Sequence, residues 1–116
     1  MEISVLIKNK TLIVSLTGEL DHHSAKEVKD MVEEVIKNRG VKNLIFDFSK
    51  LSFMDSSGIG VVIGRYKLIT AIGGNVAIVS CSRNIDRLLK MSGITKLIAT
   101  YDSLKGALKT IQEEIS

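Results

Sequence analysis

Apolar residues along the chain occur in two kinds of run, and the two kinds alternate. Short runs rich in β-branched residues are typical of strands, and the first two are separated only by residues 8–10, a spacing short enough for a hairpin. In the third run, Leu44, Ile45 and Phe46 are consecutive, which indicates a strand covered on both faces. Gly18 is expected to end the second strand. The runs predict five strands, at residues 3–7, 11–17, 41–48, 76–79 and 96–99.

Between and after the later strands, apolar residues recur every three or four positions, which predicts four helices. Ser24 and Glu27 match a capping box at the start of the first helix. Residues 49–54 are expected to form a loop leading to the second helix, and Ser82 and Asp102 are expected to cap the third and fourth. The predicted apolar faces comprise Val28, Met31, Val32, Val35 and Ile36; Ile59, Val62, Ile63, Tyr66 and Ile69; Ile85, Leu88, Leu89 and Met91; and Leu104, Leu108, Ile111 and Ile115.

The predicted order of elements is β-β-α-β-α-β-α-β-α. A hairpin followed by repeated β-α units implies an α/β fold with a mixed, mostly parallel sheet packed by helices. The chain has no linker, internal repeat or low-complexity segment. Its length of 116 residues is that of one domain, so residues 1–116 are expected to form a single unit.

Charge and composition exclude several classes of partner. The formal net charge is +3, and the basic residues are scattered along the chain. Nucleic-acid binding would require a basic stripe with aromatic residues for stacking, but the three Phe and two Tyr do not interleave with a basic run. The sequence also shows no secretory leader and no apolar stretch long enough for a bilayer. We therefore expect a soluble, cytoplasmic protein without direct nucleic-acid or membrane binding.

The residues Asp55, Ser56, Ser57 and Gly58 form the most informative turn, because they precede the second helix. Three consecutive side chains could each cap the helix, although one cap is sufficient. At least one hydroxyl is then left over at a helix end that favours anions. The turn is therefore either a plain helix cap or a place where an added phosphate can be held.

Two further glycines, Gly60 and Gly64, lie four residues apart on one side of this helix. Each costs about 0.5–1 kcal/mol relative to alanine inside a helix. Close packing of the helix on the sheet would explain them, and so would a bare face for a partner. A dinucleotide site is disfavoured because Gly58 does not directly follow a strand and no acidic residue ends the next strand. A small nucleotide-binding protein remains an unfavoured alternative.

Residues that could carry catalysis lack the partners they would need. His22 and His23 follow Asp21, but the serine turn lacks the Gly-x-Ser-x-Gly elbow of a hydrolase. The adjacent histidines have no metal-ligand spacing and no third ligand is evident. The single cysteine, Cys81, is expected to be a small buried residue at a strand end. The sequence predicts no enzymatic activity and no metal.

Three segments, residues 18–23, 53–60 and 64–67, resemble a known family. They are similar to anti-sigma-factor antagonists, the stand-alone bacterial STAS domains, and in particular to sporulation antagonists that act on the inhibitor of the forespore sigma factor. The likeness covers essentially the whole chain. It implies a STAS-type α/β domain in which Ser57, the serine directly before Gly58, is the phosphoacceptor.

The resemblance also implies a partner-switching mechanism. The unphosphorylated antagonist would bind an anti-sigma factor that is also a serine kinase and release the sigma factor. Phosphorylation would break the complex, and a serine phosphatase would restore it. ATP or ADP would be bound by the partner kinase and no cofactor by this chain. Antagonists of the general stress response share the fold and the serine, so that pathway stays open. The expected partner-binding residues are Glu19, Asp21, His22, Asp55, Ser56, Ser57, Gly58, Ile59 and Gly60.

Overall fold

A five-stranded sheet in the order β1-β2-β3-β4-β5 forms the centre of the molecule. The computed structural model describes the backbone of residues 1–115 and the side chains of residues 1–112. β1 pairs antiparallel with β2, and the other neighbours pair parallel. The mixed, mostly parallel sheet predicted from the sequence is confirmed. The strands are β1 (Glu2–Lys8), β2 (Thr11–Leu20), β3 (Asn43–Met54), β4 (Val76–Val79) and β5 (Ala99–Tyr101).

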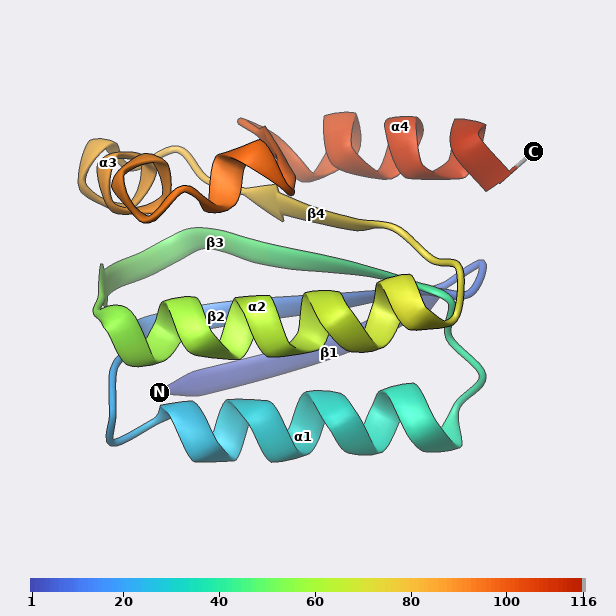
Figure 1. The fold of residues 1–116 in the computed structure, drawn as a ribbon, viewed down its shortest axis with the longest axis horizontal. Coiled ribbons are helices and arrows are strands. Elements are labelled where there is room, and N and C mark those ends of the chain that lie inside the picture. Colours follow the sequence, from blue (N-terminus) through green and yellow to red (C-terminus); the bar gives the residue numbers. More distant parts are fainter. Residues whose placement is uncertain (116) are drawn as a thin grey trace.

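Helices cover both faces of the sheet. Figure 1 shows α1 and α2 side by side and running in the same direction. The third helix, α3, contributes Ile85 and Leu89 to the same hydrophobic cluster as these two helices. α4 covers the opposite face with Ala107 and Ile111. The predicted core residue Ile115 lies outside the described side chains. The helices are α1 (Ala25–Asn38), α2 (Ser56–Ala71), α3 (Arg83–Ser92) and α4 (Leu104–Ile115), with a short 3-10 helix η1 (Ile94–Lys96).

The central strand β3 separates two hydrophobic clusters, as its uninterrupted apolar run predicts. Leu44 and Phe46 are fully buried in the larger cluster, whereas Ile45 is fully buried in the smaller one beneath α4. Since successive side chains of a strand point to opposite faces, only a strand covered on both sides can bury three in a row. No helix in the part of the chain that the structure describes is long and apolar enough to cross a membrane.

Two strands extend beyond the ends predicted from the sequence. β2 continues through Gly18 to Leu20, and residues 49–54, expected to be a loop, are the second half of β3. The register between them shifts near Ser15 and again after Gly18, where φ is +115°. These irregularities interrupt the alternation of apolar and polar residues, so the pattern alone predicts strands that end too early.

The last strand also differs from its prediction. β5 begins at Ala99, not Lys96, because residues 94–96 continue from Gly93 as a 3-10 turn. Gly93 has φ of +84°, a conformation that favours glycine and ends α3. Ile98 remains buried although it precedes the strand. The apolar run at residues 96–99 therefore predicted the buried position of Ile98 but not the start of β5.

Ser24 and Ser82 occupy the predicted N-cap positions of α1 and α3, but neither side chain caps its helix, and the cap predicted at Asp102 is wrong. The Ser24 hydroxyl donates to Glu19 O at 2.7 Å and accepts from the Asp21 N–H at 3.1 Å, so it closes the preceding loop and does not cap α1. Ser82 makes no capping hydrogen bond to α3. At α4, the cap is Ser103, whose Oγ accepts from Gly106 N–H at 3.1 Å, in place of Asp102.

Cys81 is exposed, which contradicts the prediction that it is buried. β4 ends at Val79, so Cys81 lies in the connection to α3 and not in the strand. Its Sγ lies 3.9 Å from Ser49 O.

Candidate functional site at the start of the second helix

The start of α2 is capped by one residue, Asp55. Its backbone is extended, and its Oδ1 accepts hydrogen bonds from Ser57 N–H at 2.8 Å and Gly58 N–H at 3.4 Å. One carboxylate thus satisfies two of the amides that a helix start leaves unpaired. The hydroxyls of Ser56 and Ser57 are not needed for capping and are free for another use.

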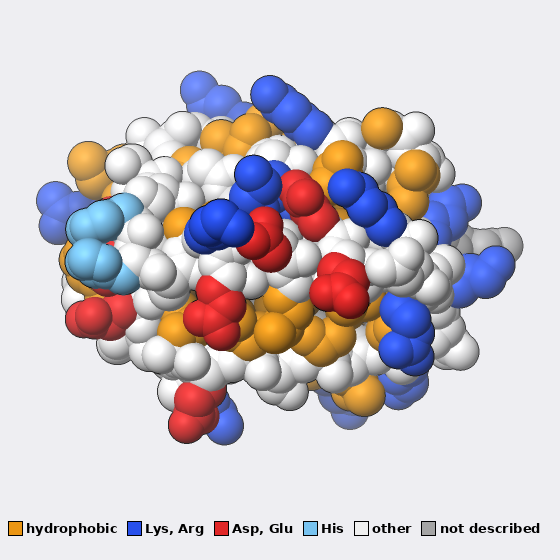
Figure 2. All heavy atoms as spheres, turned by 90° about the horizontal axis from the view of Figure 1, so that it is seen from below, with side chains coloured by type: hydrophobic (Ala, Val, Ile, Leu, Met, Phe, Trp, Pro, Cys, Tyr) orange, Lys and Arg blue, Asp and Glu red, His pale blue; other side chains and the backbone are white. Residues whose placement is uncertain are grey.

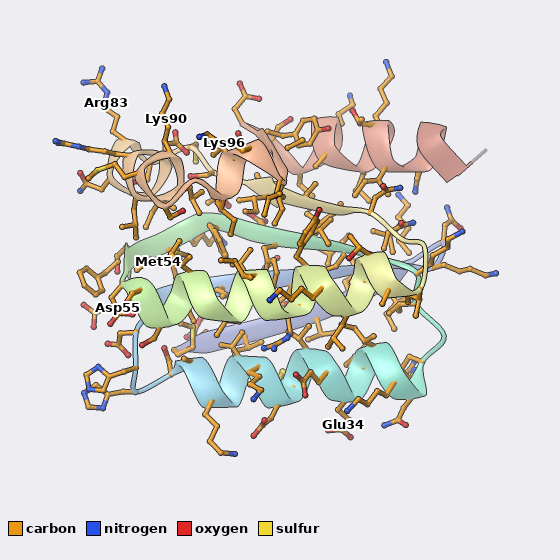
Figure 3. All side chains as sticks on the ribbon, viewed as in Figure 1. Glu34, Met54, Asp55, Arg83, Lys90 and Lys96 are labelled. Carbon is orange, nitrogen blue, oxygen red and sulfur yellow. The ribbon has the colours of Figure 1, made fainter. Side chains whose placement is uncertain are left out.

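Ser57 lies on a groove between α1 and α2. Ser56 is exposed and Ser57 is half-buried. The groove has a volume of about 250 Å³, and its lining includes Ser57, Gly60, Val61 and Arg65 from α2 with Lys26 and Lys29 from α1. The Ser57 side chain is therefore not sealed in the core. Figure 3 labels Asp55 and Met54 at the end of the molecule where β3 passes into α2.

The three glycines of this helix serve different purposes. A Cβ on Gly58 would lie 2.7 Å from Met54 Cγ and 2.9 Å from Leu20 O, so the buried Gly58 permits close packing of α2 on the strand ends. A Cβ on Gly60 or Gly64 would meet nothing within 4 Å. Close packing on the sheet therefore does not explain these two glycines, and they leave a bare strip of helix beside Ser57.

The loop after β2 lies against the start of α2. Asp55 N–H donates to Leu20 O at 3.3 Å, and Leu20 pairs with Met54 across the parallel strands. Asp21 Oδ1 accepts from His23 N–H at 2.9 Å and Ser24 N–H at 3.2 Å. The two motifs singled out in the sequence are thus adjacent in space because their strands are parallel neighbours that end at the same edge.

The carboxylate of Asp21 is held in its charged form. Desolvation raises its pKa, but the hydrogen bonds from the His23 and Ser24 amides, together with the nearby His23 and His22 imidazoles, outweigh this effect. The pKa of Asp21 therefore lies below its ordinary value of 3.8. The loop keeps a negative charge at neutral pH next to the candidate phosphoacceptor.

His22 and His23 are exposed, and their ring centroids lie 3.9 Å apart. Figure 2 shows both imidazoles at one end of the face that α1 occupies. No group of three or more His, Cys, Asp or Glu residues within the described side chains could hold a metal ion. The pair therefore belongs to the surface of the loop.

The predicted partner-binding residues come together at one end of the molecule, but not all of them reach its surface. Glu19, His22, Ser56 and Gly60 are exposed, and Asp21, Asp55 and Ser57 are half-buried. Gly58 is buried, and the half-buried Ile59 packs against the core.

Sequence reasoning missed a buried cation in this site. The Arg65 side chain is 8% exposed, and its Nη2 lies 3.1 Å from Glu33 Oε1 on α1. Within the described side chains, its Nε and Nη1 have no hydrogen-bond partner. Burial lowers the pKa of Arg65, while Glu33 and Asp30 oppose this effect. The available signal was its spacing, four and eight residues after Val61 and Ser57, which places all three on one side of α2.

An exposed aromatic residue was also missed. Phe53 is 48% exposed near the end of β3, two residues before the capping Asp55. It lines a second groove of about 300 Å³ with Met54, Asn84, Ile85 and Leu88. An apolar contact surface therefore lies on the opposite side of the serine turn from the α1–α2 groove.

Comparison with known proteins gives the class to which this fold and site belong. The model of the STAS domain matches residues 2–107, so the chain belongs to the STAS domain family. It is 43% identical over 101 residues to an anti-sigma F factor antagonist of Paenibacillus polymyxa, covering 87% of this chain and 86% of that one. It is 29% identical over 101 residues to an anti-sigma-B factor antagonist of Listeria monocytogenes, covering 84% and 88%.

Solved structures of the anti-sigma factor antagonist SpoIIAA have the same fold. The unphosphorylated anti-sigma factor antagonist SpoIIAA matches with a TM-score of 0.77 and 26% identity, covering 96% of this chain and 98% of that one. The phosphorylated Bacillus SpoIIAA matches with a TM-score of 0.75 and 27% identity, covering 95% and 99%. The family and the fold predicted from the sequence are confirmed.

Proposed function

We propose that this protein is an anti-sigma factor antagonist controlled by phosphorylation of Ser57. The observation that carries the proposal is the free hydroxyl at a capped helix start. Asp55 alone satisfies the Ser57 and Gly58 amides, and the Ser57 side chain lies on an open groove. Membership of the STAS family and 43% identity to an anti-sigma F factor antagonist support the same function.

The unphosphorylated protein binds an anti-sigma factor through the end of the molecule that carries both motifs. Glu19, Asp21 and His22 from the loop, with Ser56 and Gly60 from α2, form the polar part of this surface. Phe53 supplies an exposed apolar contact beside it. Binding of the anti-sigma factor here releases the sigma factor.

Phosphorylation switches the interaction off by local electrostatics. A phosphate adds a charge of about −1.5 to −2 at pH 7. At a helix start it is favoured by about 0.3–1 kcal/mol, so the domain tolerates it. Against an acidic group of the partner about 4 Å away, a unit charge costs about 4 kcal/mol at an effective dielectric near 20. That is about a thousandfold in affinity, enough to dissociate the complex.

The switch requires no change of fold. The two SpoIIAA structures, unphosphorylated and phosphorylated, match this chain with nearly equal TM-scores of 0.77 and 0.75. We expect the control of binding to lie in the surface around Ser57. The partner acts as the serine kinase and binds ATP or ADP, a serine phosphatase reverses the reaction, and this chain binds no cofactor.

The favoured pathway is sporulation. Identity is 43% to the anti-sigma F factor antagonist and 29% to the anti-sigma-B factor antagonist over the same length of alignment. Control of the general stress response is the alternative. Titration with both kinds of anti-sigma factor distinguishes them, and stronger binding of the sigma-B inhibitor would overturn the assignment to sporulation.

Mass spectrometry after incubation with the anti-sigma kinase and ATP tests the phosphorylation site. One phosphate is expected on Ser57, and Ser57→Ala should bind the partner but accept no phosphate. Ser56→Ala is the matched control, because it removes the neighbouring hydroxyl and should be phosphorylated as the parent protein is. Phosphorylation of Ser57→Ala to the parent level would refute the site.

A further inference from the structure

We propose that the groove between α1 and α2 is a phosphate subsite, in which Lys29 and Arg65 receive the phosphate carried by Ser57. This inference rests on the proposed function, because it describes what the phosphorylated serine contacts within its own chain. Its evidence is the geometry of two parallel helices and a buried guanidinium with unused donors.

The ion pair between the helices fixes their relative position. Arg65 Nη2 lies 3.1 Å from Glu33 Oε1, so these two residues stand level. α1 and α2 run in the same direction (Figure 1), and Lys29 and Val61 are each one turn nearer to the helix starts. Long side chains in a helix lean toward its N-terminus. Lys29 therefore leans toward the level of Ser57, and both residues line the groove.

Arg65 provides the second, independent indication of an anion. Its side chain is 8% exposed, and among the described residues its Nε and Nη1 have no acceptor. Buried donors without partners are rare and destabilising, which points to an acceptor supplied from outside the chain. Ser57 and Arg65 are two helical turns apart on α2, and both line the groove. A phosphate on Ser57 meets Lys29 directly and Arg65 through bridging water.

Charged groups of both signs surround this position, and Asp30 interacts electrostatically with Lys29 as well as with Lys26. From α1, Lys26 pairs with Asp30 at 2.6 Å, and Glu33 pairs with Arg65. Figure 2 shows basic and acidic side chains intermingled over this face. From α2 and the preceding loop, the carboxylates of Asp55 and Asp21 oppose the phosphate, but each is occupied by two backbone amides. Lys29 has no ion-pair partner within the described residues and is the cation available to the phosphate.

The bare helix surface at Gly60 completes the subsite. Gly60 lines the groove, and a Cβ at this position would meet no protein atom within 4 Å. The groove therefore has room beside Ser57 that no side chain fills. A volume of about 250 Å³ accommodates a phosphate together with water.

The test is a phosphorus-31 NMR titration of protein carrying phosphoserine at position 57, installed during synthesis so that no kinase is needed. The second pKa of a free phosphoserine is about 6. We expect a lower pKa in the parent protein, and an increase of about one pH unit in Lys29→Gln, because an opposite charge nearby favours the dianion. Lys37→Gln is the matched control, since it removes an exposed α1 lysine from the far end of the helix.

Equal phosphate pKa values in the parent and Lys29→Gln proteins would overturn the assignment of Lys29. The Arg65 Nε–H signal in a nitrogen-15 spectrum should move when phosphoserine replaces serine at position 57, and an unmoved signal would overturn the role of Arg65. The proposed function is tested separately with the same protein. If phosphoserine 57 leaves binding to the anti-sigma factor unchanged, the switch is refuted whatever the titration shows.

Discussion

Gly58 shows how closely single atoms determine the shape of the site. It is buried where α2 meets the ends of β2 and β3, and a Cβ there would lie 2.9 Å from the backbone oxygen of Leu20. Backbone atoms cannot move aside as the end of a side chain can. Gly60, two residues later, lies in the same helix with open space beside it. Gly58 is therefore required by packing, whereas at Gly60 only helix propensity decides the effect of a substitution.

We expect Gly58→Ala to lower the free energy of unfolding by about 1–3 kcal/mol, because overpacking forces the helix away from the strands. Gly60→Ala should instead raise it by about 0.5–1 kcal/mol, since alanine is the better helix former and meets no neighbour. Urea unfolding of both variants measures the difference. Equal stability in the two variants would contradict the packing at Gly58.

Asp21 should make the stability of the folded protein depend on pH in the acidic range. Its pKa is lowered in the folded protein by hydrogen bonds from backbone amides, despite an opposing effect of desolvation. A lowered pKa contributes stability above the unfolded value of 3.8, and this stability is lost as the pH falls through the folded pKa. Asp21→Asn should therefore lose less stability than the parent protein below about pH 4. Urea midpoints measured at successive pH values provide the comparison, and parallel curves would contradict it.

At the scale of elements, the start of α2 combines a capping carboxylate with two serine hydroxyls that the cap does not use. Asp55 performs the capping, which leaves the two serines outside the structural role. Asp55→Ala should lower the free energy of unfolding by about 0.5–2 kcal/mol. Ser56→Ala should stay within about 0.5 kcal/mol of the parent protein. Thermal unfolding of the two variants shows which side chain caps the helix. A larger loss of stability in Ser56→Ala than in Asp55→Ala would contradict the assignment of the cap to Asp55.

The elements also show where sequence reasoning succeeded and where it could not. The apolar run at Leu44 to Phe46 predicted a strand buried on both faces, because no other arrangement hides three successive side chains. The continuation of β2 past Gly18 was hidden by register shifts that no propensity describes. The buried guanidinium of Arg65 was missed because an arginine on a helix normally faces water. Its position depends on Glu33, a residue of another helix.

At the scale of the whole molecule, the parallel arrangement of β2 and β3 brings the two motifs together. Both motifs lie at the end of the sheet where β2 and β3 finish, and Ser57 belongs to neither hydrophobic cluster. A charge added at Ser57 therefore changes the contact surface without entering either cluster.

Ser57→Asp tests this separation between surface and core. The variant should retain the far-ultraviolet circular dichroism spectrum of the parent protein while binding the anti-sigma factor more weakly, by at least about tenfold, a difference of about 1.4 kcal/mol. Circular dichroism and a binding titration are measured on the same sample. Loss of the folded spectrum would indicate that the Ser57 side chain is structural.

The exposed position of Cys81 has a practical consequence. As the single thiol of the chain, on the connection between β4 and α3, it offers an attachment point for a fluorescent dye in the unmutated protein. A maleimide probe there would report association and release of a partner in real time, with every serine and histidine of the site left in place.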